Sequence, residues 1–164
     1  MKILILISLL SISLGSNLSE NEIMLQKVNK LRQQGCNCGN TKMKSVGTLK
    51  WNDTLEYSAF RYARHMRRFN LFSHLSIDGK DVGERLDEFG YRWQYAGENL
   101  GEGQESFDEV LKDWLKSESH CKMLMNPNMN ETGIAYFRGM WVQHFGKQLA
   151  EDMKRKDGSV KKEN

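Results

Sequence analysis

The sequence predicts an α+β domain in which helices cover a small sheet. Four segments carry helical signals and three have strand character, but they do not alternate in the regular strand–helix repeat of a doubly wound sheet. The chain has 164 residues, 39% hydrophobic and 10% aromatic, which fits one folded domain. Its net charge of +3 is too small to predict nucleic-acid binding.

The first 16 residues have the pattern of a secretory signal peptide. Lys2 precedes an apolar run from Ile3 to Leu14, interrupted only by serines, and Gly15 and Ser16 follow it. The run is shorter than the ~20 residues that span a bilayer. An uncleaved membrane anchor is the alternative interpretation. We expect a secreted or periplasmic protein with no transmembrane segment after cleavage.

The predicted domain then covers residues 17–147, and its first half contains two long helices. Ser19 and Glu22 form a capping box before a helix that ends at Gln34. A polar loop over 36–49 follows. Asn52 or Asp53 caps the second helix, which has an apolar stripe and is expected to end near Asn70. Residues 148–164 have little apolar content and predict a charged, disordered tail.

The second half of the domain mixes short helices with strands. The pattern predicts a short helix over 82–89, a strand over 91–100 and a helix over 106–119. Two further strands, 134–137 and 140–145, are expected to pair as a hairpin.

Two histidines and a glutamate are the candidates for chemistry. His74 follows the second long helix, and Glu98 lies near the end of a predicted strand. Trp114, Ser117 and His120 are spaced i, i+3, i+6, so a continuous helix would place them on one face. His74, Glu98 and His120 together could bind a divalent metal such as zinc, or could form a hydrogen-bonded polar cluster without metal.

The chain has three cysteines, and secretion exposes them to an oxidising compartment. Cys36 and Cys38 are too close in sequence for an ordinary bridge to each other. One of them is therefore expected to pair with Cys121, and Cys38, beside Gly39, is favoured. The remaining thiol is either free or paired with another chain.

Eight short motifs occur in a fixed order along the chain. They are Cys38-Gly39, Leu49-x-Trp51-Asn52, Phe72-Ser-His74, Gly90-Tyr91-x-Trp93, Gly97-Glu98-Asn99, Trp114-x-x-Ser117-x-x-His120-Cys121, Gly133-Ile134-Ala135 and Trp141-x-Gln143-x-Phe145-Gly146. Together they resemble the CAP superfamily of cysteine-rich secretory proteins, venom antigens and plant pathogenesis-related proteins. The likeness covers about residues 20–147 and is strongest to the short, secreted, bacterial-type branch. It implies an α-β-α sandwich with a central antiparallel sheet flanked by helices.

The resemblance also implies a surface cleft with a His/Glu cluster that holds a divalent ion in some members. His74 matches the first His of the cluster, and Glu98 matches the Glu of its Gly-Glu-Asn motif. The positions of the second Glu and second His hold Ser117 and Met140, while His120 is the usual residue of the bacterial branch. The expected cleft residues are therefore His74, Glu98, Ser117 and His120, with metal as one candidate ligand.

Three functions compete on this basis. The first is a secreted binding module, expected to be monomeric, whose cleft holds a small molecule, a lipid or an ion without turnover, or whose partner is an extracellular protein. The second is a hydrolase with Glu98 or His74 as general base. The third is a structural or interaction protein whose polar cluster only stabilises the fold.

Overall fold

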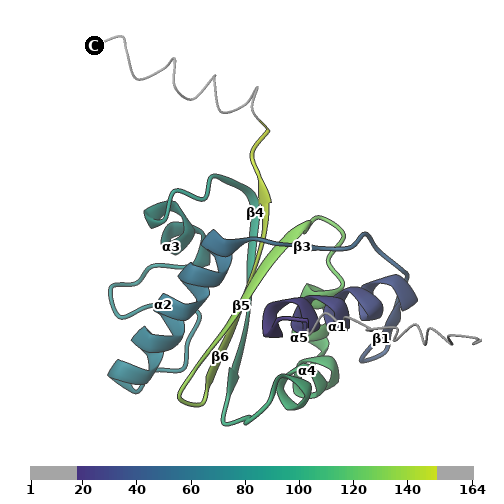
Figure 1. Cartoon of the computed structure of the whole chain (residues 1–164), viewed down its shortest axis with the longest axis horizontal. Helices are drawn as coiled ribbons and strands as arrows, with labels where there is room; N and C mark the ends of the chain where they lie inside the picture. Colours follow the sequence, from purple (N-terminus) through teal and green to yellow (C-terminus); the bar gives the residue numbers. More distant parts are fainter. Residues whose placement is uncertain (1–17, 151–164) are drawn as a thin grey trace, which may run out of the picture.

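The computed structural model describes residues 18–150 as three layers, with a β-sheet between two layers of helices (Figure 1). One face of the sheet carries α2 (Asp53–Phe69) and α3 (Val82–Glu88). The other face carries α1 (Glu20–Gln34), α4 (Phe107–Lys116) and α5 (Glu118–Leu124). The predicted α-β-α sandwich is confirmed.

The central sheet has the strand order β3-β5-β6-β4, so β4 forms one of its edges. β4 (Trp93–Glu102), β5 (Glu131–Phe137) and β6 (Met140–Gln148) pair in antiparallel fashion. β3 (Lys50–Trp51) pairs with β5 in parallel, so the sheet is not wholly antiparallel as predicted. A separate hairpin of β1 (Cys36–Cys38) and β2 (Thr41–Met43) replaces part of the expected loop.

The two long helices begin and end where local capping signals predict. Ser19 and Glu22 form the capping box of α1. The side chain of Asn52 accepts hydrogen bonds from the first turn of α2, and Asn70 ends that helix in the left-handed conformation, at φ 49°. These ends depend on neighbours in sequence, which is why the sequence predicts them.

The predicted helix over 106–119 is confirmed as far as Lys116 but is interrupted at Ser117. α4 ends at Lys116, and Ser117 has an extended backbone (φ −84°, ψ 121°) before α5 begins. Trp114 and His120 therefore lie on different helices, and the predicted common face does not exist. The break redirects the chain so that α5 carries Cys121 against the β1–β2 hairpin.

Strand alternation divides the apolar core between the two layers. Met140 and Val142 pack towards α2, whereas Trp141 and Phe145 pack towards α1 and α4. α2 approaches β5 very closely at Gly133, where an added Cβ would lie 2.0 Å from a backbone nitrogen of the helix. This contact requires glycine and fixes α2 against the sheet.

A buried arginine connects α1 to the segments around α5. The Arg32 guanidinium is fully buried and donates to the carbonyl oxygens of Gly47, Leu124, Asn126 and Met129. Burial lowers its pKa to about 10. Four backbone acceptors thus replace a carboxylate partner. They fix the segment before β3 and the segment between α5 and β5 against α1.

The structure joins Cys38 to Cys121 by a disulfide, as the sequence favours, with their Cα atoms 5.4 Å apart. Cys36 carries the free thiol, and its sulfur lies 3.6 Å from that of Cys121 and 3.8 Å from that of Cys38. Burial raises the pKa of the Cys36 thiol, which leaves it protonated and a poor nucleophile.

The predicted signal peptide and most of the predicted tail lie outside the described residues. Gln148 closes β6, so the sheet extends one residue beyond the predicted end of the domain at 147. Within residues 18–150, no helix combines the length and apolar character needed to cross a bilayer.

The disulfide assignment predicts unequal effects of cysteine substitution. Cys121→Ser should lower the free energy of unfolding by about 4 kcal/mol, because the long loop closed by the bridge gains freedom in the unfolded chain. The matched control, Cys36→Ser, should leave it nearly unchanged. Urea denaturation measures both. An equal loss in Cys36→Ser would mean that Cys36 is the native partner of Cys121.

Candidate functional site

The candidate site is built around Glu98, in the middle of the edge strand β4. Glu98 shares its strand face with Leu100, which packs towards α2, so the carboxylate also points into that layer. It is directly opposite His144 in the ladder between β4 and β6. Its side chain is only 2% exposed. An ionised carboxylate at this depth needs partners on each oxygen.

Both oxygens of Glu98 are engaged by nitrogen groups. Oε1 lies 2.7 Å from Nδ1 of His74, in the loop between α2 and α3. Oε2 lies 2.6 Å from Nη2 of Arg85 on α3 and 3.0 Å from Nε2 of the fully buried His144. We call Glu98, Arg85, His74 and His144 the Glu98 network.

Arg85 holds the network together. Its Nη1 donates to the carbonyl oxygens of His74 and Lys80, at 2.9 and 2.8 Å, and so fixes the loop that carries His74. The guanidinium carbon lies 3.5 Å from the centre of the Tyr62 ring on α2. One side chain thus connects α3, the loop, α2 and β4.

The contacts determine the charge states of the network. Burial alone would raise the pKa of the Glu98 carboxyl, but hydrogen bonds from His144 and His74 and the charge of Arg85 outweigh burial and lower the pKa to about 2. The hydrogen bond to Glu98 raises the pKa of His74. Glu98 is therefore anionic at neutral pH, and its partner His74 is biased towards the imidazolium.

His74 is the member of the network that reaches solvent, with a side chain that is 60% exposed. Since Glu98 binds its Nδ1, the other ring nitrogen is free to contact a ligand. The buried carboxylate thus orients the imidazole, while the solvent-facing side of the ring stays accessible.

His120 lies on α5, in the helical layer on the other face of the sheet. The amide of Asn99, the next residue after Glu98, donates to the His120 carbonyl oxygen at 3.2 Å. Burial, and after it the positive charge of His74, lower the pKa of the His120 imidazole. Within residues 18–150 the His120 ring has no hydrogen bond to Glu98. Ser117, at the start of α5, contacts the hydroxyl of Ser119 at 3.2 Å.

The residues do not fit the divalent ion that the resemblance suggests for His74, Glu98 and His120. Both Glu98 oxygens already have partners, and the Arg85 charge beside them would repel a cation. In the described part of the chain, the one group of His, Cys, Asp and Glu ligand atoms that converges on a point consists of Cys36, Cys38 and Cys121. Two of these form the disulfide.

Sequence reasoning missed Arg85 and His144. Strand alternation could have placed His144 on the face of Val142, towards α2, but its partner depends on the register between two strands 46 residues apart. Arg85 lies in a short helix with charged neighbours, and nothing local distinguishes it from a surface residue.

Comparison with known proteins agrees with this architecture. The sequence model "CAP: Cysteine-rich secretory protein family" matches residues 25–145. The chain belongs to this family.

Bacillus subtilis has sequence relatives of this CAP domain. "Uncharacterized protein YkwD" of Bacillus subtilis is 34% identical over 99 residues, which cover 59% of this chain and 38% of that protein. "Uncharacterized membrane protein YlbC" of the same organism is 31% identical over 103 residues, covering 63% of this chain and 30% of that protein. The chain therefore matches about a third of the length of these relatives.

Solved structures share the CAP fold at lower identity. An outer surface protein of Borrelia burgdorferi superimposes with a TM-score of 0.67 at 23% identity, covering 77% of this chain and 91% of that one. An extracellular protein containing a SCP domain from Bacillus anthracis gives 0.65 at 23% identity, over 78% of this chain and 41% of that one. At such identity the likeness supports the fold alone.

The pKa shifts predict how stability depends on pH. His74 has a raised pKa in the folded state. Its pair with Glu98 therefore stabilises the fold fully below pH ~6.5, and this stabilisation is lost as pH rises through the folded-state pKa. Glu98 has a lowered pKa, so its ionised form stabilises the fold fully above pH ~4.5, and this stabilisation is lost as pH falls towards 2. Between pH 6 and 9, the Tm of wild type should fall relative to that of His74→Gln. Solvent screening limits the corresponding change in the free energy of unfolding to below about 1 kcal/mol. Parallel Tm curves would contradict the pairing.

Proposed function

We propose that this CAP domain is an extracytoplasmic binding module that presents His74 and His120 at the β4 edge to a small ligand, without turnover. The observation that carries the proposal is the exposure of His74, whose ring is held through Nδ1 by a buried carboxylate. A ring fixed in this way loses little conformational freedom on binding. A freely rotating surface imidazole would lack that advantage.

The electrostatics define the kind of ligand that fits. His74 is biased towards a cationic donor, while the lowered pKa of His120 favours a neutral ring. A ligand with an acceptor or anionic group for His74 and a donor group for His120 matches this pair. Export is part of the proposal, and the disulfide supports an oxidising compartment.

The same contacts argue against hydrolysis. A general base works best with a pKa near the operating pH. Glu98, with a pKa lowered to about 2 and a carboxylate bound to Arg85, is too weak a base. The buried part of the Glu98 network fits a stabilising role. That role does not require the His74 imidazole to be exposed, so its exposure favours ligand binding.

Imidazole NMR tests the proposal. The ¹⁵N-labelled chain should be titrated separately with succinate, palmitate and zinc chloride. We expect one organic probe to shift the His74 and His120 signals together. The shift of the His120 signal should disappear in His74→Gln but not in the control His65→Gln. No shift with any probe, or shifts confined to His65, would contradict a binding site at the β4 edge.

A hydrolysis screen complements the titration. Peptide, ester and glycan substrates should give equal background rates with wild type and His74→Gln. A substrate that only wild type turns over would overturn the assignment as a binding module.

A further inference from the structure

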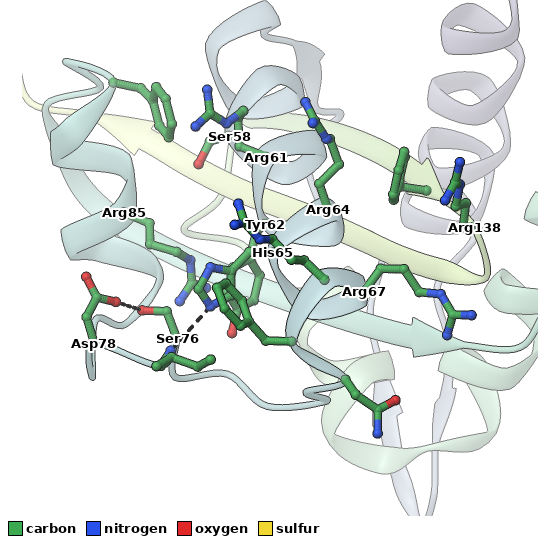
Figure 2. Close-up of a pocket in the computed structure, with 16 residues that line it drawn as sticks. Ser58, Arg61, Tyr62, Arg64, His65, Arg67, Ser76, Asp78, Arg85 and Arg138 are labelled. Carbon is green, nitrogen blue, oxygen red and sulfur yellow. Dashed lines mark hydrogen bonds between the residues drawn. The ribbon is translucent and has the colours of Figure 1, made fainter.

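A hollow on the α2 side of the molecule is lined by arginines. Its volume is about 1010 Å³, at the upper end of the range for ligand sites. Arg61, Arg64 and Arg67 come from α2, and Arg138 from the turn between β5 and β6 (Figure 2). Arg68, also on α2, completes the set. We call these five residues the arginine row and the hollow the arginine groove.

No ion pair among the described residues neutralises the arginine row. Within residues 18–150, none of the five arginines forms an ion pair. Asp78 is the one acidic residue among those described that line the groove, and its carboxylate already binds Lys80 and the Ser76 hydroxyl. The groove therefore has a local excess of positive charge in a chain of net charge +3.

Aromatic rings hold most of the row in place. The guanidinium carbons of Arg61, Arg64, Arg68 and Arg138 lie 5.3–5.9 Å from ring centres of Tyr57, Phe60, Phe69 and Phe137. Such contacts orient a guanidinium without cancelling its charge. They also occupy the rings, which are then less free to stack on nucleic-acid bases.

Two buried polar groups in the lining lack partners. Ser58 Oγ and Arg85 Nε have no hydrogen-bond partner among the described residues, although Ser58 is only 1% exposed and Arg85 6%. Each can donate a hydrogen bond. An oxyanion that reached either group would accept this hydrogen bond and remove the cost of leaving the group unpaired.

The geometry points to a polyanion with repeated phosphate groups as the occupant of the arginine groove. Guanidinium forks match phosphate oxygens in shape and charge. Arg61 and Arg68 are seven residues apart on α2, or about 10 Å along the helix axis, so one phosphate cannot contact the whole row. A flexible chain lying in the hollow reaches all of it, whereas a flat membrane surface does not follow a concave site. This site lies beyond the proposed His74 site and shares only Arg85 with it.

Binding of short-chain inorganic polyphosphate tests this inference directly. Calorimetry with the full chain at physiological ionic strength should show saturable binding. In Arg64→Gln/Arg68→Gln the Kd should rise about tenfold, and the slope of log Kd against log salt should decrease by about one to two. The matched control Lys30→Gln/Lys112→Gln removes the same charge from α1 and α4, on the opposite layer, and should leave both values nearly unchanged.

Three further probes distinguish other sources of phosphate. Monomeric phosphate and phosphatidylglycerol vesicles should bind at least tenfold more weakly per phosphate than polyphosphate, and a single-stranded oligonucleotide should not bind more tightly. Absence of polyphosphate binding, an equal loss in both double variants, or tighter binding to the vesicles or the oligonucleotide would overturn the proposal.

Discussion

The arrangement of this domain depends on one buried carboxylate. Glu98 lies in the edge strand with almost no exposure, yet remains ionised because Arg85, His74 and His144 surround it. Each partner comes from a different element, so the network connects β4, β6, α3 and the loop after α2. A charge removed from water is tolerated only when it is fully paired, and breaking such a pair costs far more than its formation contributes.

The same network separates a structural interior from a surface that can bind. Arg85 and His144 are buried and bind the Glu98 carboxylate, whereas His74 binds Glu98 through one ring nitrogen and is otherwise exposed. This asymmetry explains why a cluster that resembles a metal site in sequence does not fit a metal here. The guanidinium provides the positive charge that an ion would otherwise supply. Arg85 also lines the arginine groove, so this one residue belongs both to the Glu98 network and to the groove.

The sequence predicts those parts of the fold that are set by neighbouring residues. The caps at Ser19, Asn52 and Asn70 follow from single side chains and the turn beside them. The break at Ser117 escaped prediction because no glycine or proline marks it. Among the candidate residues, His74 and Glu98 meet as the resemblance suggests, but Arg85 and His144 depend on strand register and on α3 packing, which no local pattern reports. Arg32 is similar, since its acceptors lie up to 97 residues away.

The dependence of the fold on the Glu98 charge is tested most directly by comparing the free energies of unfolding of Glu98→Gln and Glu102→Gln. Glu102 is an exposed position on the same strand. Urea denaturation at pH 6 should show a loss of about 3–5 kcal/mol for Glu98→Gln, because Arg85 remains buried without its counter-charge. Glu102→Gln should stay within about 0.5 kcal/mol of wild type. Equal stability of the two variants would contradict the account.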